Sequence, residues 1–510
     1  MKHSSGYSIV FFLAFILAIG LAGYSLYDNS QVATERVKIQ NNADAVAYST
    51  MNVLSRDMNF MAYMNRSMVA NQVSVGQMVG LSSWFHMTDQ VIINIDLVAK
   101  ISYLVPPLGA IINNITNTLK KVSNKARDYL DKAAGKVILG IDKWIGALST
   151  AQDIFQVATA EMAFDTFDKV AKANDPDVDT GYLLSKAFVT ADLIKSWQDE
   201  VGRANTAYAN PWGKEKKLEK KRFEEFSKVI ASSRDPFTRK RSDDWTGWLG
   251  ASVPGLLSVG VKAKKRGGSD FTPRSFYGQL RWEWTAMDTV SIWRRWKIEI
   301  LGIGLKDKKT ELIPLGWGAA HALSNKNYST YYDYNKKKNR NATPDFFVDG
   351  HMGEERKKDK VWGNSTWKNK TSHKLGAWDD GYNNLQKTAG IRSFYYLKSE
   401  EKKDVGPNMV AFITKSGSKI RTMEQIDKTN SKFNRSKQVQ IEEQGSLANN
   451  TIYGLAKAET YFSRPNDITG WARKDGYREY GNLFNPFWQT RLIEAEDTER
   501  ALAIGLAQIK

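Results

Sequence analysis

Residues 7–27 read YSIVFFLAFILAIGLAGYSLY, and this stretch decides the fold of the N-terminal part of the chain. It contains 21 residues and no charged side chain. At 1.5 Å per residue, a helix of this length measures about 31 Å, the thickness of the hydrocarbon core of a bilayer. Tyr7, Tyr24 and Tyr27 lie near its ends, where aromatic side chains favour the membrane interface. The sequence therefore predicts one transmembrane helix over residues 7–27.

The residues around this span indicate its orientation. Lys2 and the N-terminal amine precede it, which favours residues 1–6 in the cytoplasm and the rest of the chain on the far side. Two alternatives remain. Residues 20–22 would serve as a signal-peptidase site, although the apolar stretch is longer than a usual signal peptide. A prepilin leader cut after Gly6 is the other, but it would place Phe11 where prepilins usually carry Glu.

Composition bounds the class of protein. The chain has 510 residues, of which 42% are hydrophobic and 12% aromatic, enough for a packed core in two or three domains. It contains no Cys, which excludes disulfides, thiolate metal sites and Cys nucleophiles and favours a bacterial envelope protein over a eukaryotic secreted one. The net charge of +18 predicts either a solvated basic surface or contact with an anionic partner.

An amphipathic helix is predicted to continue directly from the span. Residues 31–85 contain no Pro, and their only Gly residues are Gly76 and Gly80. Apolar side chains recur there in steps of three and four residues. This stripe predicts either a docking face for a partner helix or the core of the chain's own domain. The residues of the stripe taken as candidates for a partner interface are Met51, Leu54, Met58, Met61 and Met68.

Polar residues among these apolar positions are the second set of candidates. They are expected either to have a function in the stalk or to make local hydrogen bonds on the helix surface. This set consists of Asp44, Arg56, Asp57, Asn65, Arg66 and Asn71.

The whole chain is predicted to be an α+β protein. Residues 28–235 carry helical periodicity and form a helical stalk and bundle. Residues 236–445 are rich in Gly, aromatic and β-branched residues and form a basic, β-rich head. Residues 446–510 form a C-terminal helical segment that packs back on the body. The strands predicted within the head cover residues 279–284, 291–305, 312–320, 361–367, 392–397 and 409–414, and the C-terminal helices cover 447–462 and 489–508.

Catalytic signatures are absent from the sequence. The five His residues form no HExxH or other paired spacing, and no GxSxG, GxxxxGK[ST] or DxSxS motif occurs. His351 near Glu354 and Glu355 suits an exposed loop better than a metal site. We therefore expect no enzymatic activity, no catalytic residue, no metal site and no cofactor. Aromatic and basic residues interleave over 282–296 and 327–334, which predicts either stacking on a polyanion such as DNA or a Trp-filled core with outward Lys and Arg.

The segment after the span resembles a known family. Residues 40–47 read QNNADAVA, residues 56–60 read RDMNF, and residues 65–72 read NRSMVANQ. Together with the preceding span, they are similar to the TadE/TadG group of tight-adherence (Flp-type) pilus proteins, in a large proteobacterial branch. Later blocks fit the same group: SRDPFT at 233–238, GWGAA at 316–320 and EYGNLFNPFW at 479–488.

The resemblance implies a bitopic protein of the bacterial inner membrane with its C-terminal part in the periplasm. Such a protein supports the assembly or anchoring of a surface pilus or of a related secretion machine. Expected partners are the membrane, other pilus or secretion-machine proteins bound through the stalk helix, and further copies of the chain. Many TadG-like proteins carry a von Willebrand-type domain with a metal-binding DxSxS motif. This chain lacks that motif, so metal-dependent adhesion is not expected.

Overall fold

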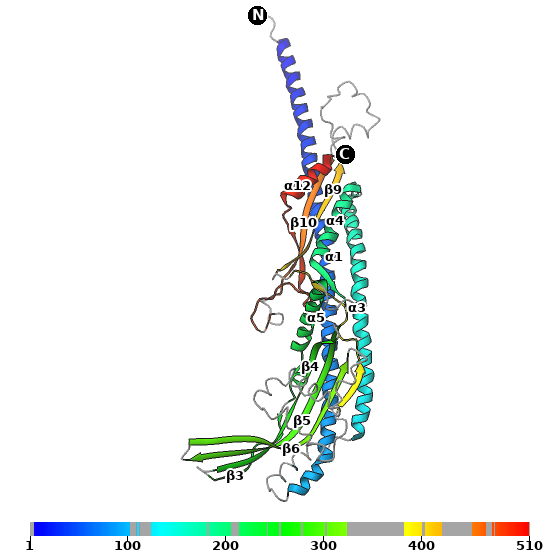
Figure 1. The fold of residues 1–510 in the computed structure, drawn as a ribbon. Coiled ribbons are helices and arrows are strands. Elements are labelled where there is room, and N and C mark those ends of the chain that lie inside the picture. The colour runs from blue at the N-terminus through cyan, green and yellow to red at the C-terminus, as the bar shows by residue number, and fades with distance from the viewer. Residues whose placement is uncertain are drawn as a thin grey trace. The chain divides into compact units, whose positions relative to one another are not determined.

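The structure is a computed structural model of the whole chain, in which α-helices and antiparallel sheets combine into a mixed α+β fold (Figure 1). The residues that it describes are 5–102, 109, 112, 124–180, 183–205, 214–241, 243–253, 257–276, 279–300, 303–323, 382–399, 403–420, 451–465, 472–473 and 475–508. The predicted strand over 361–367 and the block containing His351 lie outside these residues.

Helix α1 (Ser5–Ser102) is a single helix of 98 residues that starts with the apolar span. Among the described residues, α1 is the one helix that is both long enough and apolar enough to cross a membrane. The side chains of residues 8–26 are exposed, whereas Ile39 and Ala43 are already buried. The absence of Pro after the span allows the helix to continue without a break in its hydrogen bonds.

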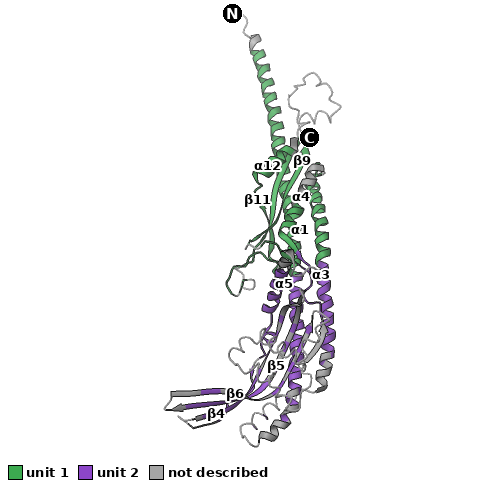
Figure 2. Cartoon of the chain, in the orientation of Figure 1, with its two compact units in different colours: residues 1–63, 152–202, 395–510 green, residues 64–151, 203–394 purple. Residues whose placement is uncertain are grey.

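The chain forms two compact units, each assembled from separate segments (Figure 2). Unit 1 contains residues 1–63, 152–202 and 395–510, and unit 2 contains residues 64–151 and 203–394. Both α1 and α3 (Asn124–Asn174) contribute residues to each unit. The strands β1 (Val201–Ala204) and β8 (Phe394–Leu397) form a small two-stranded sheet.

Unit 1 packs a three-stranded sheet on helices. The antiparallel order is β11 (Trp488–Ile493), β10 (Thr451–Phe462) and β9 (Val405–Ser416). Its core joins this sheet to α1, the second part of α3, α4 (Leu183–Glu200) and α12 (Asp497–Gln508). The Ala residues of α1 allow close contact, and Gly454 of β10 lies so near the helix that a Cβ there would be 2.4 Å from the carbonyl oxygen of Ile39.

Unit 2 contains the longest strands. The main path of its sheet is β2 (Asp243–Asp244), β4 (Leu257–Phe276), β5 (Gln279–Ile300), β6 (Ile303–Leu323) and β7 (Tyr382–Lys387), while β3 (Leu249–Val253) also pairs with β4. All described pairs are antiparallel except β6–β7. One face packs on α1, where Met87 and Val91 meet Val261 and Ile292. Helices α5 (Lys214–Ser232) and α6 (Pro236–Arg239) contact β4.

Several predicted elements are confirmed. Helices occupy much of residues 28–235, and the predicted strand over 279–284 and the first part of the one over 291–305 belong to the single strand β5, while residues 303–305 begin β6. Residues 312–320, 392–397 and 409–414 fall largely in β6, β8 and β9.

The C-terminal prediction is wrong for residues 447–462. The structure forms β10 there instead of a helix, because the segment is paired on one side with β9 and on the other with β11. Pairing to both neighbours overrides the local helix propensity of its Ala and Leu residues. The helix predicted over 489–508 is confirmed only in its second part, since residues 488–493 form β11 and α12 begins at Asp497.

Candidate functional site

The junction between the span and unit 1 is short. Val32 already packs against the core of unit 1, five residues after Tyr27. At 1.5 Å per residue this distance is about 7.5 Å, which is comparable to the headgroup layer on one side of a bilayer. Unit 1 therefore begins directly at the membrane surface if residues 7–27 span the bilayer.

A buried ion cluster follows this junction. The ammonium group of Lys415 on β9 donates to Glu35 on α1 at 2.7 Å and to Asp175, just after α3, at 2.8 Å. Burial opposes the charged form of Glu35, but hydrogen bonds from Lys38 and Lys415 and their charges lower its pKa. The pKa of Asp175 is likewise lowered against the effect of burial, and that of Lys415 is raised. The cluster joins α1, α3 and the sheet in the part of unit 1 that lies nearest the apolar span.

Two amide side chains of α1 bind edges of the same sheet. β11 reaches only as far as Ile493 opposite Lys457, so the outward backbone groups of Leu455 have no strand partner. Gln40 supplies one: its Nε2 donates to the Leu455 carbonyl at 2.8 Å, and the Leu455 N–H donates to Gln40 Oε1 at 3.3 Å. Gln40 thus replaces the missing strand with its side-chain amide.

Asn59 makes the equivalent contact with β11. Its Nδ2 donates to the carbonyl of Trp488, and the N–H of Trp488 donates to Asn59 Oδ1, both at 2.9 Å. Since each side-chain amide pairs both the N–H and the C=O of one strand residue, Gln40 and Asn59 hold the sheet on the helix in a fixed register. Sequence reasoning missed both residues. For Gln40 the available signal was its place at the start of the QNNADAVA segment.

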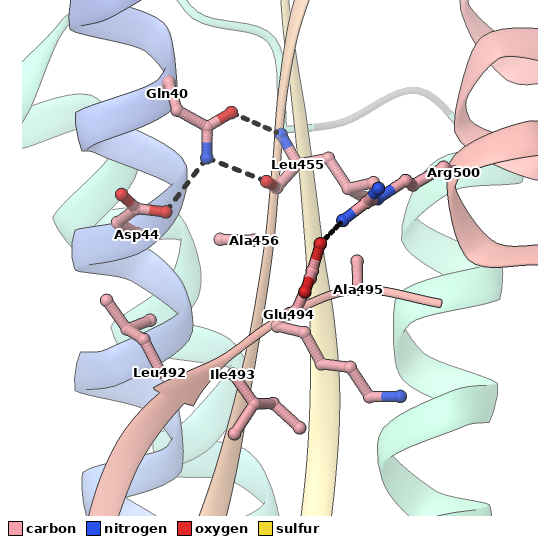
Figure 3. Close-up of a pocket in the computed structure, with 10 residues that line it drawn as sticks. Gln40, Asp44, Leu455, Ala456, Leu492, Ile493, Glu494, Ala495 and Arg500 are labelled. Atoms are coloured by element: carbon pink, nitrogen blue, oxygen red, sulfur yellow. Dashed lines mark hydrogen bonds and ion pairs between the residues drawn. The ribbon is translucent and has the colours of Figure 1, made fainter. Parts of the chain in front are cut away.

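A groove of about 200 Å³ lies beside Gln40 (Figure 3). α1 contributes Gln40 and Asp44, the strands β10 and β11 contribute apolar residues, and Arg500 of α12 lies opposite, paired with Glu494 at 2.6 Å. Asp44 accepts a hydrogen bond from Gln40 at 2.9 Å. The charged groups at the groove are therefore held by neighbours, and their arrangement brings together no nucleophile and base.

The QNNADAVA segment has a structural role throughout. Besides Gln40, Asn42 donates to the carbonyl of Ala171 at 2.9 Å and accepts from Asn174 at 3.2 Å, so it satisfies the C-terminal end of α3. Ala43 and Ala47 are buried in the core of unit 1. The segment that carries the family resemblance is thus the segment on which unit 1 assembles.

The predicted interface stripe is covered by the chain itself. Met51, Leu54, Met58 and Met61 lie in the core of unit 1, and Met68 is buried in unit 2. These residues therefore form part of the chain's own core. They present no docking face, because residues such as Thr460 of β10 lie against Met58. The exposed face of α1 in unit 1 contains Val37, Tyr48, Asn52, Arg56 and Tyr63.

The six polar candidates are not brought together into one site. Asp57 and Asn65 are buried, Asp44 and Asn71 are half-buried, and Arg56 and Arg66 are exposed. Asn71 donates to the carbonyl of Ser67 within the helix at 2.8 Å, which is the local hydrogen bonding expected as an alternative.

Asp57 is the exception among them. It is 1% exposed, its Oδ1 accepts from Thr159 of α3 at 3.2 Å, and its Oδ2 has no hydrogen-bond partner. Burial raises the pKa of Asp57 to about 7, although the Thr159 hydrogen bond acts in the opposite direction. A single isolated carboxyl group of this kind favours neither metal binding nor paired acid–base chemistry.

Unit 2 contains a second buried ion cluster. Asp288 of β5 accepts from Arg241 at 2.9 Å and from Lys265 of β4 at 3.0 Å, and Ser83 of α1 donates to it at 2.8 Å. Burial opposes ionisation, but the charges of Arg241 and Lys265 keep the pKa of Asp288 low. Arg241 also donates to Gly268 and to Ser269, so the cluster fixes α1 and β4 to β5.

Close backbone contacts surround this second cluster. A Cβ on Gly318 of β6 would lie 2.2 Å from the carbonyl oxygen of Ser83, and one on Gly80 would lie 2.5 Å from Arg241. Gly76 faces the ring of Trp284 in the same way. The two Gly residues that α1 contains after the span are therefore positions where the sheet of unit 2 approaches the helix.

Within the described residues, no group of three His, Asp or Glu side chains could hold a metal ion. Neither ion cluster contains a nucleophile beside a free base. Both have the arrangement of structural clusters, in which each buried charge is opposed by another.

Comparison of the chain with protein-family models, with curated proteins and with solved structures finds no match.

Proposed function

We propose that this chain is a non-enzymatic, inner-membrane-anchored component of a bacterial pilus of the Tad/Flp type or of a related secretion machine. In this role it acts in assembly or anchoring or as a minor pilin-like subunit. Residues 1–6 lie in the cytoplasm, and the parts of both units that follow the span lie in the periplasm. The observation that supports the proposal most is the continuity of α1 from an exposed apolar span into the buried centre of unit 1.

Continuity matters because a helix transmits position and torque, whereas a flexible linker does not. Any protein that packs against the span would thereby fix the orientation of unit 1. The ion pair between Glu35 and Lys415 and the amide contacts of Gln40 reinforce this connection within the first turns after the membrane. A subunit of an envelope machine has a use for such a rigid connection, and a tethered enzyme has none.

The partner surface is proposed to be the outward face of α1 in unit 1. Val37, Tyr48, Arg56 and Tyr63 lie within an arc of about 100° around α1, and the first, second and fourth are exposed apolar or aromatic side chains. Tyr and Arg are enriched at protein interfaces because they combine apolar surface with hydrogen-bonding groups. This face replaces the methionine stripe as the place where a partner helix would bind.

Site-specific photocrosslinking in native membranes tests the proposal. A photoreactive phenylalanine analogue at Tyr48 is expected to capture pilin-like or pilus-platform proteins, identified by mass spectrometry. The same group at buried Met58 is the matched control and is expected to give only crosslinks within the chain. Capture of no envelope-machine protein from Tyr48, Arg56 or Tyr63 would argue against the proposal.

A second candidate function is polyanion binding by unit 2. The ring of Trp248 is contacted by Lys262 at 5.6 Å and by Arg295 at 5.8 Å, and exposed Trp296 lies 5.0 Å from Arg294. Interleaved cations and aromatic rings of this kind suit stacking on single-stranded nucleic acid. However, Arg295 is already held by Asp307 at 2.8 and 2.7 Å, which reduces the charge available to a ligand.

Fluorescence anisotropy with a labelled single-stranded oligonucleotide separates this candidate from the first. Binding at low salt that falls steeply at moderate salt, and that weakens in Trp296→Ala, would support it. Absence of binding at low salt would end it without affecting the pilus proposal.

A further inference from the structure

In helix α12 the charged and the apolar residues are separated along the helix axis and do not lie on opposite faces. Asp497, Glu499 and Arg500 form its charged first turn, whereas residues 501–507 read ALAIGLA and contain no polar side chain. A helix on the surface of a protein in water is usually apolar on one face only, and one that is apolar all round is covered on all sides. The second part of α12 therefore has the composition of a covered helix.

The chain itself covers only one side of this part. Ala503 is buried in the core of unit 1, but Leu502 and Ile504 are 42% and 45% exposed. Successive residues of a helix are 100° apart, so these two side chains flank Ala503 on opposite sides. Ala501 is exposed as well. Of the side chains at residues 501–504, three are thus exposed and one is buried.

The position of α12 within unit 1 is fixed by contacts at its first turn. Glu499 accepts from Lys457 of β10 at 2.7 Å, and Leu455, two residues earlier on β10, is bound by Gln40 of α1. Gln40 follows Tyr27, the last residue of the span, by 13 residues, which is about 20 Å along a helix. The charged start of α12 therefore lies on the order of 20 Å from the hydrocarbon edge.

The rest of α12 extends back toward the membrane. The helix contacts β9 and β10, and Figure 1 shows its C-terminal end near the end of β9, where Lys415 binds Glu35 below the span. From Glu499 to Gln508 the helix rises about 13 Å. The apolar end of α12 is therefore the part of the helix nearest the headgroup layer, which is about 5–8 Å deep.

We propose that residues 501–507 form a second membrane contact, in which the apolar end of α12 enters the headgroup layer of the bilayer that α1 spans. Leu502 and Ile504 are then covered by lipid, while the carboxylates of its first turn stay in water. This inference rests on the proposed span over residues 7–27. It adds a lipid contact at the opposite end of the sequence, so that unit 1 is held to the membrane at two points and cannot turn freely about α1.

The natural chain contains no Cys, so single Cys variants can be labelled without background. Full-length protein in lipid nanodiscs is labelled with the fluorophore NBD at Leu502→Cys or Ile504→Cys. Thr498→Cys, one turn earlier on the side of Leu502, is the matched control, and exposed Val157→Cys on α3 is the reference for water. Phe12→Cys within the span reports insertion. Nitroxide groups on the lipid headgroup or deep in the acyl chain serve as quenchers.

The expected result is blue-shifted emission from positions 502 and 504 with several-fold stronger quenching by headgroup nitroxide than at positions 498 and 157. Water-like emission at 502 and 504, with Phe12 quenched by the deep nitroxide, would overturn this inference and leave the span intact. Loss of quenching at Phe12 would overturn the span and this inference together. Blue-shifted emission without lipid quenching, dependent on protein concentration, would show that a second copy covers α12 and would also overturn it.

Discussion

Units 1 and 2 each pack a sheet on α1 with a buried ion cluster, and the central group of the cluster is a cation in unit 1 and a carboxylate in unit 2. In unit 1 one buried cation, Lys415, binds the two carboxylates Glu35 and Asp175, and exposed Lys38 pairs with Glu35 from outside this cluster at 2.7 Å. In unit 2 one carboxylate, Asp288, binds the two cations Arg241 and Lys265. The side chains of the first cluster are 6%, 11% and 17% exposed, and those of the second are 0%, 3% and 5% exposed.

This difference in exposure predicts that removing one charged partner lowers the free energy of unfolding more in unit 2 than in unit 1. A charge that keeps some contact with water can be rehydrated when its partner is removed, whereas a fully buried one cannot. Loss of one charge from the cluster of unit 2 should therefore destabilise the core of that unit strongly. Loss of one charge from the cluster of unit 1 should destabilise it less, and by an amount that depends on pH.

The largest expected effect is that of Asp288→Asn. It leaves Arg241 and Lys265 buried with one unit of opposing charge removed, and the loss of unfolding free energy should be about 3–5 kcal/mol. Urea unfolding followed by tryptophan fluorescence measures it, because Trp284 and Trp293 are buried in the same unit. Asp307→Asn, which removes the exposed partner of Arg295, is the matched control and should cost about 1 kcal/mol or less. Equal effects of the two variants would break the comparison.

Asp57→Asn is expected to act in the opposite direction, as a pH-dependent stabilisation. The pKa of Asp57 is raised from 3.8 to about 7 by burial, so the folded state holds a proton that the unfolded state has released. Stability therefore falls as pH rises from about 4 to about 7, by up to about 4 kcal/mol at about 1.4 kcal/mol per pKa unit.

The Asn variant removes this titration, so it should be more stable than the natural chain at pH 8 and lose that advantage at pH 4. Urea unfolding at the two pH values measures the change. A difference between variant and natural chain that does not vary with pH would contradict the raised pKa. Thr159→Val serves as a control, because it removes the hydrogen bond and keeps the carboxyl group.

Lys415→Met should cost less than Asp288→Asn, on the order of 2–3 kcal/mol at pH 7, because Glu35 and Asp175 retain contact with water. The pKa values of both carboxyls are lowered in the folded state, so the stability they contribute is present above their ordinary values and is lost as pH falls below about 4. The cost of the variant should therefore shrink at pH 3. A cost that is undiminished at pH 3 would show that packing of the Lys415 stem, and not its charge, carries the effect.

The smallest effects, about 1–3 kcal/mol each, are expected where a glycine of each sheet meets α1. In Gly318→Ala the new methyl group meets the backbone of Ser83, and in Gly454→Ala it meets that of Ile39. Gly140→Ala on α3 is the control, because nothing lies within 4 Å and a helical Gly is expected to gain about 0.5–1 kcal/mol on replacement. Thermal unfolding of the three variants measures these changes, and unchanged stability of both sheet variants would refute the close approach.

Local patterns in the sequence were enough to predict the apolar span and the amphipathic helix that together form α1. The apolar span follows from length and charge alone, and the three- and four-residue spacing of Met51, Leu54 and Met58 predicts the helix that continues from it. The same spacing could not distinguish a docking face from a core, because both need apolar side chains on one side. Only the burial of Met58 against β10 distinguishes them.

Contacts between distant parts of the sequence could not be predicted. β10 was expected to be a helix because the spacing of apolar residues over 447–462 is helical, and its pairing with β9 and β11 cannot be inferred from this segment alone. In the same way, Lys415 lies 380 residues from Glu35, and Gln40 lies 415 residues from Leu455. The isolation of Asp57 likewise follows from the packing of α3 on α1.

The most direct test of the unbroken connection between membrane and unit 1 is hydrogen–deuterium exchange of the full-length protein in lipid nanodiscs, followed over residues 24–45. One helix with the Glu35–Lys415 pair and the Gln40–Leu455 contacts predicts slow exchange without a break from the span into the buried residues Ile39 and Ala43. Fast exchange over residues 28–36, between two protected segments, would show a hinge at the membrane surface and would contradict the role of α1 as a rigid anchor.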